Sequence, residues 1–116
     1  MTVINRANAP HYMWAQICEG WRLLEGDDLS VTEERMPPQT REERHLHEQA
    51  NQLFFLLEGS LTIDLDDVIH QLAPSDALNI KPGQMHQVRN DSQTKPARFL
   101  VISSPTTQGD RISAET

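Results

Sequence analysis

The chain contains a single cysteine, Cys18, and has no long uninterrupted apolar run. A lone cysteine excludes an internal disulfide, and the missing apolar run excludes a transmembrane helix. The first residues also lack the apolar core of a secretory signal peptide. We therefore expect a cytoplasmic protein with no membrane partner, in which Cys18 is a small buried apolar residue.

Basic residues are scarce as well. The 116 residues include 10 Lys and Arg against 17 Asp and Glu, which gives a formal net charge of -7. Nucleic acids and anionic membranes are bound by clustered Lys and Arg, and here the basic residues are scattered. The composition therefore argues against a nucleic-acid or anionic-membrane partner.

Convincing helical periodicity is also missing after Trp21. Short apolar or alternating segments follow one another instead, each bounded by turn-forming residues. They span residues 29–36, 52–58, 61–65, 68–72, 77–80, 85–90 and 98–102. Strands of this length and spacing are typical of a β-sandwich or barrel. We predict an all-β protein with an N-terminal extension (1–28) that packs on the barrel or on a partner chain, a barrel domain (29–104) and a C-terminal tail (105–116).

Three histidines are the most informative residues. His45 and His47 are two positions apart, so on an extended segment they point to the same face. His86 follows the Pro82-Gly83 turn on a distant predicted strand. Imidazole nitrogens are good ligands for Zn, Cu, Ni and Fe. The histidines therefore indicate a metal site assembled inside a β structure.

Gln52 is the candidate fourth ligand. It lies five residues after His47, and this odd spacing would place it on the opposite face of an unbroken strand. The polar residues 48–51 predict a turn, which resets the alternation and allows Gln52 to face the histidines. On the same argument Phe54 and Leu56 share the face of Gln52, while Val88 and Asn90 share the face of His86. We predict that these four residues line the pocket.

These residues resemble the two sequence motifs of the cupin superfamily, whose members are small double-stranded β-helix (jelly-roll) barrels. The first motif is His-x-His, three or four residues, Glu, six residues, Gly, and the chain has His45-Leu46-His47, Gln52 and Gly59 at this spacing. The second is Gly, five residues, Pro-x-Gly, two residues, His, three residues, Asn, and the chain has Ser75, Lys81-Pro82-Gly83, His86 and Asn90. The spacing agrees throughout, over roughly residues 29–102. Gln52, Ser75 and Lys81 replace the Glu, Gly and Pro of the motifs.

The resemblance implies a cupin-type jelly-roll barrel with a short N-terminal extension. It implies a divalent transition metal ion (Zn, Ni, Fe, Mn or Cu) held by His45, His47, Gln52 and His86. A Gln ligand brings no negative charge, so the ion would be a stronger Lewis acid and would attract an anionic substrate. Arg35 would hold a substrate carboxylate if its strand face lines the barrel. The alternative for Arg35 is an exposed ion pair.

Two functions are compatible with these residues. The first is a metal-binding cupin that acts on a small anionic metabolite, by the Lewis-acid chemistry of an isomerase or lyase or by dioxygenase chemistry. The second is a non-catalytic barrel that binds or senses a small molecule and has a degenerate metal site. The sequence does not assign catalytic residues to either. Phe55 and Leu57 point away from the barrel interior and need cover, and because cupins commonly pair, we expect a homodimer.

Overall fold

The computed structural model describes residues 3–114. Positions 1, 2, 115 and 116, which belong to the predicted N-terminal extension and C-terminal tail, lie outside the described residues. The described chain forms β1 (His11–Trp14), β2 (Cys18–Leu24), β3 (Ser30–Met36), β4 (Thr40–Arg41), β5 (His45–Leu46), β6 (Asn51–Glu58), β7 (Leu61–Leu65), β8 (Val68–Leu72), β9 (Ala77–Ile80), β10 (His86–Asn90), β11 (Ala97–Ser104) and β12 (Ile112–Ser113). Within residues 3–114 no helix has the length and apolarity that crossing a membrane requires.

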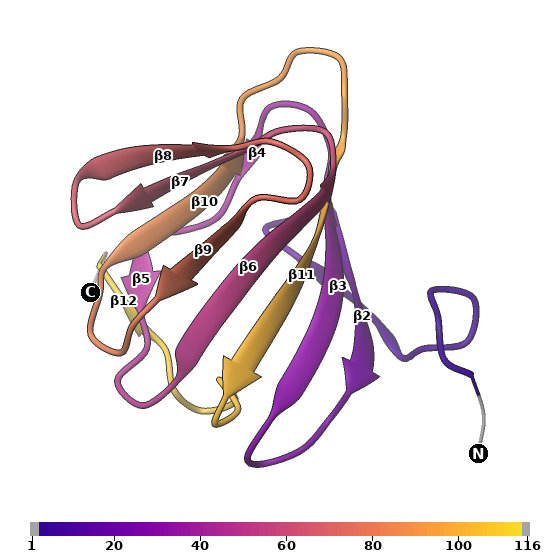
Figure 1. The fold of residues 1–116 in the computed structure, drawn as a ribbon, viewed down its shortest axis with the longest axis vertical. Helices are drawn as coiled ribbons and strands as arrows, with labels where there is room; N and C mark the ends of the chain where they lie inside the picture. The colour runs from indigo at the N-terminus through magenta and orange to yellow at the C-terminus, as the bar shows by residue number, and fades with distance from the viewer. Residues whose placement is uncertain (1–2, 115–116) are drawn as a thin grey trace.

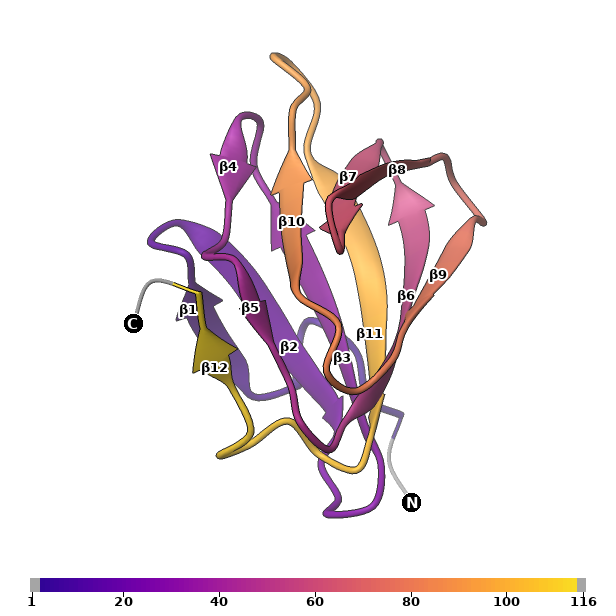
Figure 2. The ribbon, with the colours of Figure 1, turned by 90° about the vertical axis from the view of Figure 1, so that its left-hand side faces the viewer.

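The strands form two antiparallel sheets that face each other (Figures 1 and 2). The first sheet has the order β1-β2-β3-β11-β6-β9, and the second has the order β12-β5-β10-β7-β8, with β4 also pairing with β10. The chain crosses repeatedly between the sheets, and the crossings from β5 to β6 and from β9 to β10 are the ones next to the histidines. This arrangement confirms the predicted all-β, jelly-roll fold.

Strand alternation places the core between the sheets. On β6 every second residue from Gln52 to Leu56 is buried, and on β11 the same holds from Ala97 to Ser103. Leu61, Ile63 and Val88 from the opposite sheet complete this layer. Toward one end of the core the buried residues become polar, with Gln52 and Ser103 paired across β6 and β11. The fold therefore gathers a group of buried polar side chains at this end of its interior.

Both terminal regions take part in the sheets. Strand β2 pairs with β3, and β1 pairs with β2. Residues 11–24 therefore add two strands to one edge of the first sheet. At the other end, β12 pairs with β5 of the second sheet. Cys18 is fully buried in β2, as expected from the sequence.

Two motif glycines occupy the left-handed region of backbone torsion space. Gly59 has φ +85°, and a Cβ built there would lie 2.3 Å from the carbonyl oxygen of Pro96. Gly83 has φ +83°, but a Cβ there would meet nothing within 4 Å. Glycine is therefore needed at position 59 for both torsion and space, and at position 83 for torsion alone.

We expect Gly83→Ala to lower the free energy of unfolding by about 1 to 2 kcal/mol, the usual cost of a left-handed alanine. Gly59→Ala should cost at least ~3 kcal/mol, because overlap with the backbone of Pro96 adds to the same torsional strain. Urea unfolding of the two variants measures the difference. Equal losses of stability would contradict the close approach of Gly59 to Pro96.

Candidate metal centre

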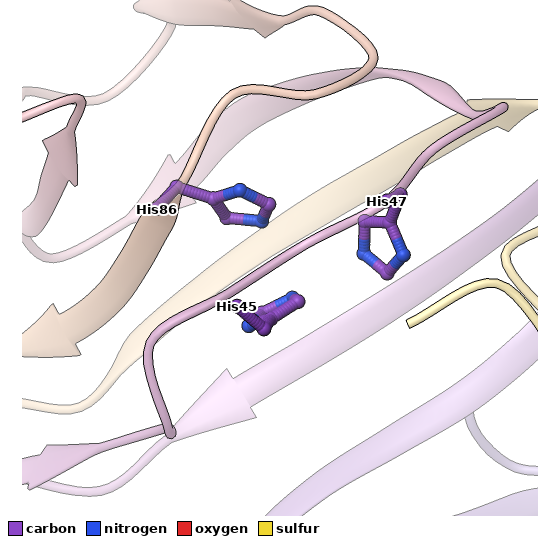
Figure 3. Close-up of side chains that lie close together, drawn as sticks. All are labelled: His45, His47 and His86. Atoms are coloured by element: carbon purple, nitrogen blue, oxygen red, sulfur yellow. The ribbon is translucent and has the colours of Figure 1, made fainter. Parts of the chain in front are cut away.

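The three motif histidines converge from two neighbouring segments of the second sheet. His45 belongs to β5, His47 follows it, and His86 begins β10, where it pairs directly with His45. Figure 3 shows the three rings turned toward a common space. One nitrogen from each ring lies within 4.8 Å of the others, and all three side chains are buried. The geometry therefore brings together the three histidines that the sequence predicted.

Each imidazole is oriented by a hydrogen bond from its Nδ1 to a backbone carbonyl. His45 donates to Glu43 O at 2.9 Å and His86 donates to Gln84 O at 3.0 Å. His47 donates to the carbonyl of Asp110. Once Nδ1 carries the proton, Nε2 has the free lone pair that a metal requires. The histidines therefore present three Nε2 atoms as ligands.

Gln52 enters the site from the first sheet. Its Nε2 donates to the Ser103 hydroxyl at 3.1 Å, and its Oε1 is buried without a hydrogen-bond partner. The Nε2 atom of His86 is also buried without a partner. A buried acceptor with no partner is costly, and a cation satisfies such acceptors. These two unpaired atoms show that the residues fit a divalent ion.

The donor set and spacing agree with that fit. Two imidazole nitrogens on one tetrahedral zinc lie roughly 3.3 Å apart, given Zn–N distances of about 2.0 Å. The three imidazole nitrogens here lie within 4.8 Å of one another, which allows wider spacings than this. Small side-chain rotations would bring them to the distances that a bound ion requires. Three imidazoles and an amide oxygen suit Zn, Ni, Fe, Mn and Cu, and do not select one of them.

The site opens into a cavity of about 570 Å³. His45, His47, Gln52 and Phe54 line one side of it. Residues from β1, β2, β3, β11, the 25–27 loop and the C-terminal segment 106–111 line the rest. The lining residues with ionisable or hydroxyl groups include Tyr12, Arg22, Glu34, Glu42, Ser103 and Arg111. A small metabolite therefore has space beside the histidines.

The family model of the cupin domain matches residues 32–103, which is more than half of the chain. The chain belongs to the cupin family. Among curated proteins, quercetin 2,3-dioxygenase of Bacillus subtilis (strain 168) is 34% identical over 98 residues. That match covers 72% of this cupin and 29% of the dioxygenase, so the chain spans less than a third of the length of that relative.

Solved structures share the fold at lower identity. The polyketide cyclase RemF from Streptomyces resistomycificus superposes with a TM-score of 0.77 at 22% identity, covering 91% of this cupin and 80% of the cyclase. An RmlC-like cupin from Shewanella frigidimarina gives a TM-score of 0.81 at 15% identity, covering 91% and 92%. KdgF from Halomonas sp. gives 0.80 at 15% identity, covering 91% and 94%. At these identities the likeness establishes the fold.

The histidines of this cupin are neutral at physiological pH. Burial, together with the neighbouring imidazoles, lowers the pKa of His45 to about 3 and the pKa of His86 to about 4. Burial also lowers the pKa of His47, against the raising effect of its bond to the Asp110 carbonyl. A metal ligand must be deprotonated, so the three imidazoles are in the ligand form without the loss of a proton.

A tyrosine and a glutamate form a hydrogen-bonded pair that lines the cavity. The Tyr12 hydroxyl donates to Glu34 Oε2, and the Arg22 guanidinium lies 4.1 Å from the centre of the tyrosine ring. Gly20 leaves room for this ring, because a Cβ there would lie 2.1 Å from Tyr12 Cζ. Burial raises the pKa of Glu34 to about 7, and burial with the Glu34 charge raises the pKa of Tyr12.

Glu42 is a second carboxyl group close to the histidines. It accepts the Val88 backbone N–H at 3.0 Å, and burial raises its pKa to about 8. Its Oε2 lies 3.7 Å from His45 Nδ1, a separation that would describe an ion pair if both groups were charged. Burial disfavours both charges, so at neutral pH the contact joins a neutral imidazole to a largely protonated carboxyl group.

The predicted lining residues have different positions. Phe54 lines the cavity, whereas Leu56 and Val88 are fully buried in the apolar core. Asn90 is also buried, and its amide donates to the carbonyls of Met36 and Lys95 at 3.0 and 2.9 Å, which holds the loop after β10. These three residues share the inward face as expected, but none of them lines the cavity: Leu56 and Val88 lie in the apolar core, and Asn90 lies at the opposite end of β10 from His86.

Arg35 lies on the outer side of its strand. Strand β3 directs Thr32 and Glu34 into the cavity, so the alternate residue Arg35 faces away from it. Its guanidinium lies 4.0 Å from Glu19 Oε1. The condition for a role in substrate binding is therefore not met, and the ion-pair alternative describes Arg35. Glu34, the neighbour that does face the cavity, carries no motif signal, and only the register of β3 identifies it.

We expect metal-free protein to bind one divalent zinc or cobalt ion per chain. His86→Ala should weaken metal binding at least ~100-fold, because it removes a direct ligand. Even the loss of a residue that only hydrogen-bonds a ligand typically lowers metal affinity 10- to 100-fold. Isothermal titration measures this, on protein purified without an affinity nickel column. His70→Ala, a half-buried histidine on β8, is the control and should bind as wild type. No uptake by wild type would refute the metal site.

Glu34 makes the metal-free protein less stable as pH rises. Its pKa is 4.5 when unfolded and about 7 when folded, so between these values the folded chain holds a proton that the unfolded chain has lost. The stability contributed by this group is complete below pH 4.5 and declines up to pH 7 and above.

Between pH 4.5 and pH 8, Glu34→Gln should therefore gain about 1 to 3 kcal/mol of stability relative to wild type. Urea unfolding across this range gives the difference, and Glu58→Gln on the exposed end of β6 is the control. A difference between wild type and Glu34→Gln that does not change with pH would show that the folded protein does not hold this proton.

Proposed function

We propose that this cupin is a metal-dependent enzyme that acts on a small, oxygen-rich anionic metabolite by Lewis-acid chemistry with proton transfer, in the manner of an isomerase or lyase. One observation carries the proposal. The unpaired acceptors His86 Nε2 and Gln52 Oε1 belong to a site whose cavity also contains Glu34 and Glu42, carboxyl groups able to hold a proton at neutral pH.

His45, His47, His86 and Gln52 would hold the ion. A divalent ion bound there would polarise a carbonyl or enolate oxygen of the substrate. All four ligands are neutral, so they leave the charge of the ion uncompensated, and this charge favours an anionic substrate. Arg111, which also lines the cavity, adds positive charge to the same space.

The remaining cavity residues support proton transfer. A general acid or base works best when its pKa is near the working pH, and the values of about 7 and 8 for Glu34 and Glu42 meet this condition. The hydroxyl of Tyr12 fixes Glu34 by its hydrogen bond. Phe54 and Trp14 are apolar parts of the same wall.

Dioxygenase chemistry is the second candidate. It is supported by the 34% identity to quercetin 2,3-dioxygenase and by the suitability of imidazole ligands for iron and copper. The two candidates differ in their need for dioxygen, so turnover with and without oxygen separates them.

The decisive experiment is a turnover screen of protein reconstituted separately with Zn, Ni, Mn, Cu and Fe(II). Sugar acids, keto acids, catechols and flavonols are offered with and without oxygen, and products are identified by mass spectrometry and NMR. We expect anaerobic turnover of an anionic substrate. Glu34→Gln should reduce kcat about 10²-fold or more at unchanged metal content. Oxygen-dependent turnover would favour the dioxygenase, and saturable binding without turnover would favour the non-catalytic module.

We also propose that the protein is a cytoplasmic homodimer. Phe55 and Leu57 on β6 lie on the outer face of the first sheet, together with Leu100 and Ile102 on β11, and all four are half-buried. A second copy would cover this apolar face. Light scattering at micromolar concentration should give about twice the chain mass of 13.2 kDa, and a mass near 13.2 kDa would rule out the dimer.

A further inference from the structure

The C-terminal segment lies along the strand that carries the first histidine. We call residues 105–114 the C-terminal strap. Its strand β12 pairs with β5, with Ser113 opposite His45, and the Ala114 N–H donates to Arg44 O at 2.9 Å. In Figure 2 the yellow β12 lies next to β5. The strap therefore returns from β11 to the metal-binding edge of the second sheet.

Asp110 connects the strap to the turn after His47 through its side chain. The carboxylate accepts three consecutive backbone N–H groups, from Glu48 at 2.7 Å, Gln49 at 3.0 Å and Ala50 at 3.0 Å. Successive N–H groups that converge on one anion form a rigid cradle. This is the same turn that reverses the side-chain alternation between His47 and Gln52.

Asp110 also contacts His47 itself, because its backbone carbonyl accepts the Nδ1 proton of the imidazole. The other two histidines differ in this respect. His45 and His86 donate to the carbonyls of Glu43 and Gln84, each two residues earlier in the same segment. Two ligands are thus oriented locally, whereas the third is oriented by a residue 63 positions later in the chain.

We propose that Asp110 is a positioning residue for the metal ligand His47, which makes the C-terminal strap a working part of the metal centre. The carboxylate holds the strap on the 48–50 turn, and the carbonyl then keeps His47 in the tautomer that presents Nε2. This inference rests on the proposed function, since metal binding is what His47 is positioned for. Residues that hydrogen-bond a metal ligand without touching the metal typically change metal affinity 10- to 100-fold.

The strap also forms part of the cavity wall through Thr106, Thr107, Gln108 and Arg111. One residue, Asp110, therefore links the orientation of a ligand to the wall that closes over the substrate space. Linkage is reciprocal, so an ion bound at His47 should in turn make the strap more ordered.

The test compares Asp110→Ala and Asp110→Asn with Asp76→Ala. Asp76 is a matched control, because its carboxylate accepts a loop N–H, that of Ala73 at 2.8 Å, far along the chain from the strap. The dissociation constant of cobalt(II) is measured by absorption spectroscopy. We expect Asp110→Ala to bind cobalt 10- to 100-fold more weakly with an altered cobalt spectrum, Asp110→Asn to recover part of the loss, and Asp76→Ala to match wild type.

Imidazole ¹⁵N NMR of the metal-free proteins provides an independent readout. Wild type should show His47 protonated at Nδ1, and Asp110→Ala should show a mixture of tautomers at His47 alone. An unchanged His47 signal with unchanged cobalt affinity in Asp110→Ala would overturn the inference, as would an equal loss of affinity in Asp76→Ala. If wild type binds no cobalt, the proposed function fails, and the His47 tautomer still decides the role of Asp110.

Discussion

The pairing of His45 with His86 across β5 and β10 is the contact on which the site depends. It joins two segments about forty residues apart and places two imidazoles inside the barrel with a third beside them. Burying three imidazoles lowers their pKa values, and His86 Nε2 and Gln52 Oε1 are left without hydrogen-bond partners. A fold that carries this cost at one end of its core is organised for a ligand that satisfies those atoms.

Burial also explains the electrostatics of the cavity. It favours the neutral form of every ionisable group, so it lowers the pKa of the imidazoles and raises the pKa of Glu34 to about 7 and of Glu42 to about 8. At neutral pH the ligand shell therefore contributes almost no charge of its own. A divalent ion entering this shell would impose its full positive charge on the cavity, and Gln52, in the place of a carboxylate, is the residue responsible.

The local sequence predicted the fold and the convergence of the three histidines because the signals for both are short motifs. Short apolar or alternating segments bounded by turn residues predicted most of the strands between β3 and β11, and the spacing of the histidines and turn residues predicted the candidate ligand set. The side chains of Leu56, Val88 and Asn90 were correctly expected to face inward. Their distance from the cavity could not be predicted, because alternation defines which face of a strand a residue lies on and not its position along the barrel axis.

What the sequence by itself determined is the strand pattern, the family and the four residues that would hold an ion. The tertiary structure decided which residues surround that ion. Arg35 and Glu34 are neighbours on one strand, and only the register of β3 directs Glu34 into the cavity and Arg35 away from it. Asp110 and Arg111 lie in a polar segment without periodicity, and they reach the site because the chain folds back to pair β12 with β5. Strand register and the pairing of β12 with β5 depend on packing of the whole barrel. Local sequence patterns therefore do not predict them.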